Sequence, residues 1–443
     1  MKESHFLRYG TSSEQKYMAS YQHTYDGIAI NGNMLAHISK SISLFVHKDI
    51  GKEFFIDPMT HSFQHETEKI SSASGRIKSS IKKLIEIYGN PLKLILDEFR
   101  PITATDFNTN NIPKFVATVL GFQKDHIRRS LDEEYSDYID YLEISKEPIF
   151  LIAPYFYMQS DRTFDDWFSL NSRMINESIK LKAEYKKDIF AELVIDKKLL
   201  CDEDKINKIL KTYSDSKIDG LLYWINGFDE TQATVDELSA VKDFVVKYKR
   251  SNPNKKIISL YGGYFSELLM GISNALDGVV HGLEYGESRE VVPVGGGIPI
   301  SKYYFPDIKK RMPELRMSKI LLVLKIDTPV KFHKQICDCK KCKETIVKDV
   351  LPDFNRYFKA KPKIIKFKKT GNTREIDYPE RESKELCLFH YLEVKNKEFK
   401  YIKEHGISDI ANELTKVHEK YKEHLNEMEI GHLERWAKVL SDG

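Results

Sequence analysis

Short apolar runs alternate with amphipathic segments from about residue 25 onward, whereas residues 1–20 are polar and are expected to be a lead-in segment. Apolar runs of about four to eight residues predict buried strands, and apolar positions three or four residues apart predict helices. The predicted strands are 25–30, 54–56, 149–153, 189–195, 220–224 and 256–261. The predicted helices are 34–46, 74–88, 111–122, 167–183, 204–213, 235–250 and 265–274.

Repeated strand–helix units of this kind predict an α/β fold with a parallel sheet, and their number favours a (β/α)₈ barrel of the TIM type. A doubly wound sheet is the competing fold. That fold usually has a glycine-rich turn after its first strand, and the sequence has no GxGxxG or GxxxxGK[ST] at such a place. Gly295–Gly297 occurs late, between prolines, and is expected to be a loop.

Polar residues follow several of the predicted strands, and in a barrel the chemistry gathers at the C-terminal ends of the strands. These positions are Asn31, Asp57, 153–159, Asp196, Asn226, Gly227, Tyr261, Gly262, Gly263 and Asp277. Two of the carboxylates, Asp57 and Asp277, are expected to converge on one pocket. Such a pair can act as a nucleophile at the anomeric carbon of a sugar and as its general acid/base partner. An aspartate at a strand edge can also be a turn or cap residue, so a structural role stays open for both.

Composition and charge restrict the function further. The 443 residues carry a formal net charge of +3, so any affinity for nucleic acid must come from local patches. No apolar run is long enough to cross a membrane. The N-terminus lacks the hydrophobic core of a signal peptide, and a cytoplasmic location is therefore expected.

Four of the five cysteines lie between residues 337 and 387, a spacing that predicts a metal site and not a disulfide framework. Cys337, Cys339 and Cys342 lie within six residues, and His390 follows downstream. Three thiolates and one imidazole complete a tetrahedral zinc shell without an open position for substrate. The sequence therefore predicts a structural Zn²⁺ ion held by these four residues, and Cys387 stays open as an alternative that could replace or supplement one of them.

At this point the residues resemble those of the tRNA-guanine transglycosylase superfamily. The Cys-x-Cys-x-x-Cys motif followed by His390 is similar to the zinc motif of that family. The segments 54–64 (FFIDPMTHSFQ), 258–269 (ISLYGGYFSELL) and 276–285 (LDGVVHGLEY) resemble its strands that carry catalytic residues. The resemblance runs from about Tyr25 to Glu398.

This resemblance implies a (β/α)₈ barrel with a zinc-binding subdomain that exchanges a guanine base for a 7-deazaguanine. It implies that Asp277 is the nucleophile, that Asp57 is the general acid/base, and that no organic cofactor is needed. The expected substrate-binding residues are His61, Tyr261, Gly262, Gly263 and His281.

Departures from the family pattern resemble the DNA 7-deazaguanine transglycosylase branch (DpdA-type). Pro58–Ser62 replaces the Ser-Gly-Gly that follows the first aspartate, and the segment 149–159 contains no carboxylate. The spacer between Cys342 and His390 is also long. The expected function is therefore a pentosyltransferase that places 7-cyano-7-deazaguanine (preQ0) into DNA. The same exchange on tRNA remains an alternative, as does a non-catalytic nucleic-acid-binding scaffold. A helper protein of the same pathway is left open as a partner.

The spacer also predicts a nucleic-acid contact, because clustered cations bind phosphates and interleaved aromatic rings can stack on bases. Eight basic residues occur without an acidic one between 355 and 374, namely Arg356, Lys359, Lys361, Lys363, Lys366, Lys368, Lys369 and Arg374. A solvated loop or a contact with a partner protein are the alternatives. The predicted domains are a barrel over 1–336, an inserted zinc-binding subdomain over 337–398 with a basic insertion at about 343–386, and a C-terminal helical tail over 399–443.

Overall fold

The computed structural model describes residues 4–72, 74–142, 144–272, 274–283, 287–292, 300–366 and 373–441. The chain forms two compact units. The first unit comprises Met1–Asp229 and Asp236–Val294, and the second comprises Glu230–Val235 and Gly295–Gly443. The predicted loop at Gly295–Gly297 lies outside the described residues.

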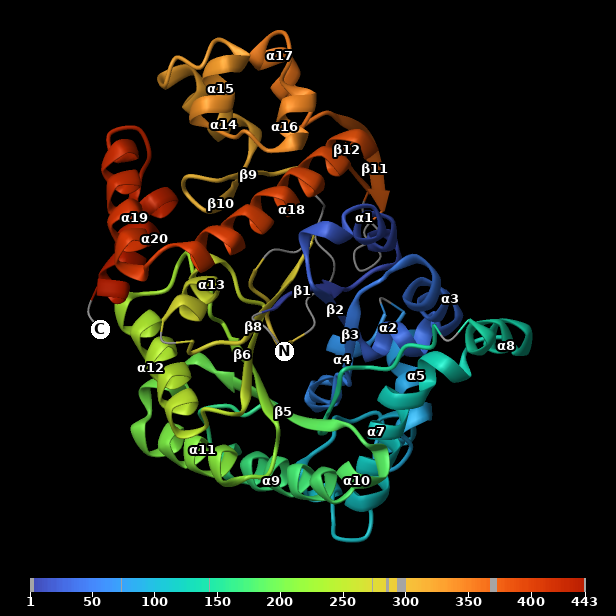
Figure 1. Ribbon diagram of the computed structural model, residues 1–443. Coiled ribbons are helices and arrows are strands. Elements are labelled where there is room, and N and C mark those ends of the chain that lie inside the picture. The colour runs from blue at the N-terminus through green and yellow to red at the C-terminus, as the bar shows by residue number, and fades with distance from the viewer. Residues whose placement is uncertain are drawn as a thin grey trace. The chain divides into compact units, whose positions relative to one another are not determined.

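The first unit is an α/β fold built on eight parallel strands, which Figure 1 shows enclosed by helices. The strands are β1 (Ser4–Tyr9), β2 (Gly27–Asn31), β3 (Glu53–Asp57), β4 (Phe150–Ile152), β5 (Asp188–Asp196), β6 (Gly220–Asn226), β7 (Lys256–Leu260) and β8 (Gly278–Gly282). Their order in the sheet is β3-β2-β1-β8-β7-β6-β5-β4. The two edges meet where the Ile149 amide donates to the Phe54 carbonyl at 2.9 Å. The sheet is thus a nearly closed barrel, consistent with the predicted TIM-type architecture.

Strand β1 lies within the segment that was expected to be a lead-in, and that expectation is wrong. Its register pairs Phe6 with Gly27 of β2 on one side and with Val280 of β8 on the other. All six residues of β1 are buried. Polar residues interrupt its apolar pattern, and their contacts become visible only in the folded barrel; for example, the His5 amide donates to Asp26.

Aromatic side chains fill the interior of the barrel. Alternate residues of a strand point to the same face, so Phe6, Phe55, Phe150 and Phe190 project inward from four strands. The rings of Phe150 and Phe190 stack with centroids 3.9 Å apart. Gly220 leaves space for this layer, because a Cβ atom there would lie 2.3 Å from the Phe190 ring. The interior is therefore a packed core.

Helices follow most of the strands and cover the barrel with their apolar faces. In α5, for example, Ile81, Leu84, Ile85 and Tyr88 are buried at helical spacing. The helices of this unit are α1 (Gln15–Ser20), α2 (Gly32–His37), α3 (Ser39–Leu44), α4 (Thr67–Ile70), α5 (Ser79–Tyr88), α6 (Leu94–Asp97), α7 (Ile112–Arg129), α8 (Glu133–Tyr141), α9 (Phe164–Lys180), α10 (Lys182–Tyr185), α11 (Glu203–Asp215), α12 (Val235–Ser251) and α13 (Tyr264–Gly271). Each predicted helix has a counterpart, although the one at 34–46 is divided into α2 and α3.

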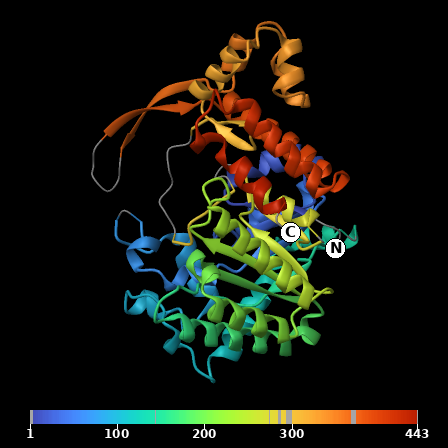
Figure 2. The same cartoon turned by 90° about the vertical axis from the view of Figure 1, so that its left-hand side faces the viewer.

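The second unit consists of helices and two short antiparallel sheets. Its strands are β9 (Tyr303–Phe305), β10 (Lys310–Met312), β11 (Ala360–Lys366) and β12 (Thr373–Pro379). Its helices are α14 (Glu314–Val323), α15 (Pro329–Gln335), α16 (Lys340–Thr345), α17 (Val350–Asn355), α18 (Arg381–Glu404), α19 (Ile407–Tyr421) and α20 (Glu427–Ser441). Figure 2 shows the β11–β12 hairpin extending away from the helices of this unit.

The boundaries of the units differ from the predicted domains. Residues 300–336, which were expected to belong to the barrel, form β9, β10, α14 and α15 of the second unit. Helix α18 carries His390 and continues across the predicted boundary at residue 398. The metal-ligand segment and the C-terminal helices therefore belong to one compact unit.

None of the helices in the described part of the chain combines the length and the apolar character needed to cross a membrane.

Candidate functional site

The first part of the candidate site is a buried polar cluster at the C-terminal end of the barrel, centred on Asp57. Asp57 is the last residue of β3 and is 2% exposed. Its Oδ1 accepts hydrogen bonds from the Met59 amide at 2.8 Å and from the Tyr155 hydroxyl at 2.6 Å. Its Oδ2 lies 3.5 Å from Nη2 of Arg8. These donors and the adjacent cation hold the carboxylate in one orientation.

Arg8 was not identified from the sequence, since it lies in the segment that was expected to precede the fold. It projects from β1 on the same face as Phe6, into the barrel. Its guanidinium lies 4.3 Å from the centre of the Tyr261 ring. Burial lowers the pKa of Arg8 to about 10, with Arg289 acting in the same direction and Asp57 in the opposite one. Arg8 therefore remains a cation at neutral pH.

Two of the predicted substrate-binding residues lie in this cluster. Nδ1 of His61 is 3.0 Å from the Tyr155 hydroxyl, and the two rings stack with centroids 5.4 Å apart. The guanidinium groups of Arg8 and Arg289 lie 4.3 and 5.6 Å from the centre of the Tyr261 ring, and its hydroxyl accepts from Arg289 at 3.1 Å. Burial, followed by the nearby His65 and the arginines, lowers the pKa of His61 well below its usual value. His61 is therefore neutral at physiological pH.

A second carboxyl group, Glu192 of β5, lies close to Asp57 and was also missed in the sequence. It is 1% exposed, and it lies on the same face of β5 as Phe190 and Val194, which belong to the barrel core. Burial, and then the charge of Asp57, raises the pKa of Glu192 well above its usual value. Apart from Glu192 and the residues at its ends, the strand is apolar on both faces. An acidic residue in the middle of an otherwise apolar strand is therefore the sequence feature that could have identified Glu192 as a functional residue.

Asp277 does not belong to this cluster, and the prediction that Asp57 and Asp277 converge on one pocket is wrong. Asp277 precedes β8, whereas Asp57 ends β3, and all strands of the barrel are parallel. A strand of five residues spans roughly 13 Å, so the two carboxylates lie at opposite ends of the barrel. The carboxylate of Asp277 accepts from Lys249 at 2.7 Å, from Lys256 at 2.9 Å and from the Ile257 amide at 3.0 Å. These contacts join the N-terminal ends of β7 and β8 to α12.

The other predicted substrate-binding residues lie outside the barrel interior. His281 alternates with the inward-facing Val280, so it faces the outer side of the sheet. There its Nε2 contacts Nε2 of His5, and the two rings stack. A Cβ atom at Gly262 would lie 2.6 Å from that of Ser266, so this glycine allows α13 to pack closely after β7. Gly263 is the N-cap residue of α13.

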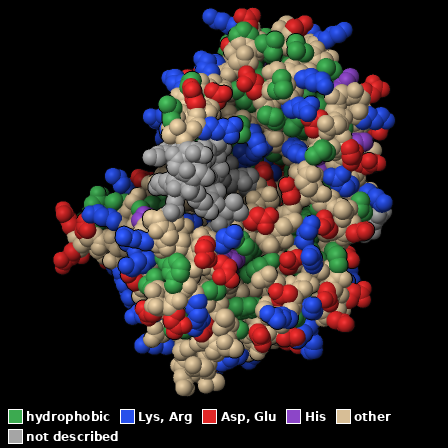
Figure 3. All heavy atoms as spheres, turned by 180° about the vertical axis from the view of Figure 1, so that it is seen from behind, with side chains coloured by type: hydrophobic (Ala, Val, Ile, Leu, Met, Phe, Trp, Pro, Cys, Tyr) green, Lys and Arg blue, Asp and Glu red, His purple; other side chains and the backbone are tan. Residues whose placement is uncertain are grey.

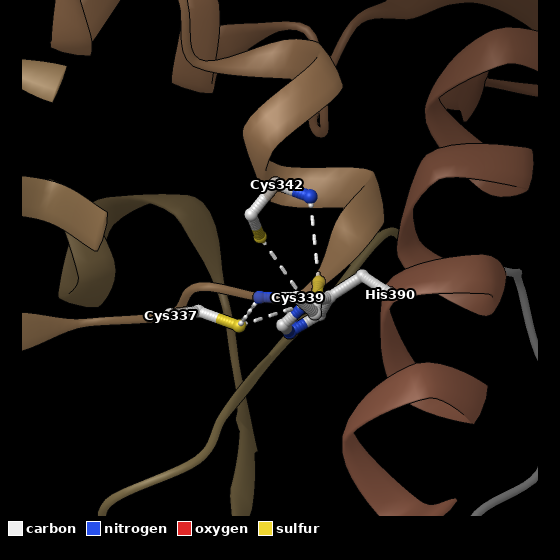
Figure 4. Close-up of side chains that lie close together, drawn as sticks. All are labelled: Cys337, Cys339, Cys342 and His390. Carbon is white, nitrogen blue, oxygen red and sulfur yellow. Dashed lines mark hydrogen bonds between the residues drawn. The ribbon is translucent and has the colours of Figure 1, made fainter. Parts of the chain in front are cut away.

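The second part of the candidate site is a metal centre in the second unit. Cys337, Cys339, Cys342 and His390 are buried, and their ligand atoms all lie within 4.8 Å of one another. Figure 4 shows the four side chains pointing toward one another, with the cysteines in and before α16 and the histidine on α18. Nδ1 of His390 lies 3.4 Å from the sulfurs of Cys339 and Cys342 and 3.8 Å from that of Cys337.

These distances fit a tetrahedral zinc ion. With Zn–S and Zn–N bonds of about 2.3 and 2.1 Å, a ligand nitrogen and a ligand sulfur are separated by about 3.6 Å. Nε2 of His390 lies 2.6 Å from the Tyr304 carbonyl, and a proton on that nitrogen leaves Nδ1 available for the metal. Amide groups of Cys339 and Cys342 also donate to the sulfurs of Cys337 and Cys339. The donor set can hold a metal ion and leaves no position for a substrate.

Cys387 is a neighbour of this centre and not one of its ligands. It lies on α18 and is buried, and its sulfur is 3.3 Å from the Tyr357 carbonyl. The long spacer between Cys342 and His390 forms α17 and the β11–β12 hairpin, after which α18 returns to the cysteines. The spacing of the ligands therefore reflects an inserted hairpin.

Three basic residues of the spacer share one face of this hairpin. The register pairs Lys361 with Tyr378, Lys363 with Ile376 and Ile365 with Arg374, which places the three basic side chains on one face. The opposite face carries Glu375 and Asp377, which directly follow the basic segment in the sequence. One face of the hairpin is therefore basic and the other is acidic.

The remaining predicted cations have varied positions. Arg356 forms an ion pair with Glu382 at 2.6 Å, and Lys359 is exposed directly before β11. The side chain of Lys366 and residues Lys368 and Lys369 lie outside the described part of the chain. In Figure 3, Lys and Arg side chains are interspersed with Asp and Glu side chains over the visible face, in keeping with the low net charge. The basic hairpin face is thus a local feature.

No protein-family model matches the chain, and no curated protein matches it either.

We expect Asp277→Asn to lower the free energy of unfolding by about 2 kcal/mol, because two lysines then lose a charged partner in a poorly exposed place. Urea denaturation of the variant and the wild-type protein measures this difference. Asp215→Asn, which removes an exposed ion pair with Lys211, is the matched control and is expected to have little effect. Equal stability of wild type and Asp277→Asn would contradict the structural role.

We expect Cys342→Ser to abolish binding of about one zinc ion per chain and to lower the unfolding temperature, because one of four ligands is lost. Cys387→Ser changes a buried cysteine nearby and should leave the zinc content unchanged. Metal analysis of the purified proteins, with thermal unfolding before and after chelation, checks both expectations. Zinc loss in Cys387→Ser alone would show that the ligand set is wrong.

Proposed function

We propose that this chain is a guanine transglycosylase that exchanges guanine in DNA for a 7-deazaguanine such as 7-cyano-7-deazaguanine. The observation that carries the proposal is the environment of Asp57, a buried carboxylate at the C-terminal end of a barrel strand, held between two hydrogen-bond donors and an arginine. Its neighbours His61, Tyr155 and Tyr261 supply flat rings of the kind on which a nucleobase can stack. The Cys₃His cluster with a motif similar to that of the family supports the same proposal.

In this proposal Asp57 takes the role of nucleophile, because Asp277 lies at the opposite end of the barrel. An Asp57 oxygen forms a bond to C1′ of the sugar while the C1′–N bond to guanine breaks, and the electron pair of that bond leaves with the base. The departing base then receives a proton. In the second step the incoming 7-deazaguanine loses a ring proton, its nitrogen bonds to C1′, and Asp57 leaves with its electron pair. Two displacements on the same carbon retain its configuration.

The surrounding residues stabilise the charges that these steps create. The Met59 amide and the Tyr155 hydroxyl hold Oδ1, which leaves Oδ2 to attack C1′ and keeps the carboxylate orientation constant. Arg8, which contacts the same carboxylate, favours its release from the sugar as an anion in the second step. A zinc ion in the Cys₃His cluster would stabilise the second unit and would take no part in the reaction.

The basic face of the β11–β12 hairpin is the proposed contact with the DNA backbone. Lys361, Lys363 and Arg374 are exposed on it, and Nζ of Lys363 lies 4.2 Å from the centre of the Tyr378 ring. Cations on an exposed, two-stranded element can bind successive phosphate groups of the DNA backbone, and such contacts do not depend on the base sequence. The hairpin belongs to the same unit as the metal cluster, so a bound metal would stabilise the segments from which the hairpin extends.

We expect the wild-type protein to release labelled guanine from double-stranded DNA when 7-cyano-7-deazaguanine is present, with cell extract added in one arm to supply any helper protein. Asp57→Asn should lower the rate of guanine release by at least about 1,000-fold, because the amide is a poor nucleophile. Asp277→Asn, once folded, should keep it. Release from tRNA alone would place the activity on RNA, and no release from either polymer would favour a binding scaffold.

We expect the triple variant Lys361→Ala/Lys363→Ala/Arg374→Ala to bind DNA more weakly and with a smaller dependence on salt. Each lost phosphate contact should reduce the slope of log K against log[salt] by about 0.9. The control, Glu375→Ala/Asp377→Ala, changes the acidic face of the same hairpin and should not weaken binding. Fluorescence anisotropy with labelled DNA at several salt concentrations measures both slopes. A slope in the triple variant equal to that of the wild type would show that the hairpin does not contact the DNA backbone.

A further inference from the structure

The proposed reaction needs a proton for the departing base, and Asp57 is not suited to supply it. Asp57 is the nucleophile of that reaction, and its carboxylate is held by two hydrogen-bond donors and by Arg8. The imidazole of His61 is buried, and its pKa lies well below the usual value because of burial first and then of His65 and the arginines. His61 is therefore neutral at physiological pH and is not a ready acid. The donor must be a different group.

Glu192 occupies an unusual position for a glutamate. It lies in the middle of β5, in register with Leu222 of β6, and is 1% exposed. Neither of its carboxyl oxygens makes a hydrogen bond of normal geometry among the described residues, although the Tyr155 hydroxyl lies close enough to influence the carboxyl group. A buried polar group without a partner costs free energy, so such a group calls for a reason other than stability.

The groups around Glu192 keep it protonated. The titratable groups that act on it are Asp57 of β3, Tyr155 after β4 and Arg8 of β1. Burial has the largest influence and raises the pKa of Glu192, and the charge of Asp57 raises it further. Tyr155 and Arg8 act in the opposite direction and have smaller effects. Two neighbouring carboxyl groups thus have unlike surroundings, as in enzymes that divide the roles of nucleophile and acid between them.

We infer that Glu192 is the proton donor of this site, which gives its proton to the base that leaves when Asp57 attacks the sugar. This inference rests on the proposed function. As the C1′–N bond breaks, the Glu192 O–H bond breaks toward the departing guanine, which leaves neutral, and Glu192 becomes a carboxylate. The incoming 7-deazaguanine then gives its ring proton to that carboxylate as its nitrogen bonds to C1′. Glu192 is thereby protonated again, and no further reactant is needed.

The first test compares leaving bases. We expect Glu192→Gln to lower guanine release from DNA by about 100-fold or more, which is the usual contribution of a general acid. DNA that carries 7-methylguanine is the second substrate, since this base already has a positive charge and leaves without a further proton. On it, Glu192→Gln should approach the wild-type rate above the protein-free background, whereas Asp57→Asn should stay inactive. Equal loss on both substrates would overturn the role as donor.

The second test does not depend on activity. Glu192 is expected to bind its proton more tightly in the folded chain than in the unfolded chain, whose ordinary value is 4.5. The folded state of the wild type therefore loses stability as the pH rises above this value. Since a glutamine side chain does not titrate, the unfolding temperature of Glu192→Gln should rise relative to wild type between pH 5 and pH 8. A constant difference over this range would show that Glu192 is already ionised and would overturn the inference.

The outcomes distinguish this inference from the proposed function. Wild-type guanine release that Glu192→Gln leaves unchanged would remove Glu192 from the reaction while the transglycosylase proposal stands. No release by the wild-type protein from DNA or tRNA, even with cell extract, would overturn the proposed function and the donor role with it.

Discussion

The candidate site depends on one strand, β1, and on its insertion between β8 and β2. Parallel strands in a nearly closed barrel bring their C-terminal ends together, and β1 supplies the pairing that joins the two halves of the sheet. The same strand carries Phe6 into the apolar layer of the interior and Arg8 into the polar layer above it. Phe6 therefore packs in the core, whereas Arg8, two residues later on the same face, places a positive charge beside Asp57.

The two carboxyl groups of the polar layer are both buried, but they differ in the hydrogen bonds that they receive. Asp57 receives two donors and a cation, whereas Glu192 lies in the same buried layer without a hydrogen bond of normal geometry among the described residues. In a medium that solvates ions poorly, only one of two adjacent carboxyl groups can be ionised without a large cost. Burial and the charge of Asp57 raise the pKa of Glu192 well above its usual value, whereas Asp57 is held by its donors and by Arg8. That difference supports the proposed division of roles between a nucleophile and a proton donor.

The second unit combines an apolar core with a cluster of metal-ligand side chains. Three thiols and an imidazole meet between α16 and α18, and aromatic rings surround them; Tyr303, for instance, stacks on His390 with centroids 4.0 Å apart. A metal ion held there would join segments that are far apart in sequence.

The sequence by itself determined the parallel α/β architecture, most helices and strands, the four metal ligands and the place of Asp57 at the end of a strand. These features rest on local periodicity and spacing, which do not depend on distant parts of the chain. The tertiary structure alone decided that Ser4–Tyr9 is a strand, that Asp277 begins a strand instead of ending one, and that Lys361, Lys363 and Arg374 share a face. It also brought Arg8 and Glu192 to Asp57. The position of a residue at one end or on one face of a sheet follows from register with neighbouring strands, and register is a property of the whole barrel.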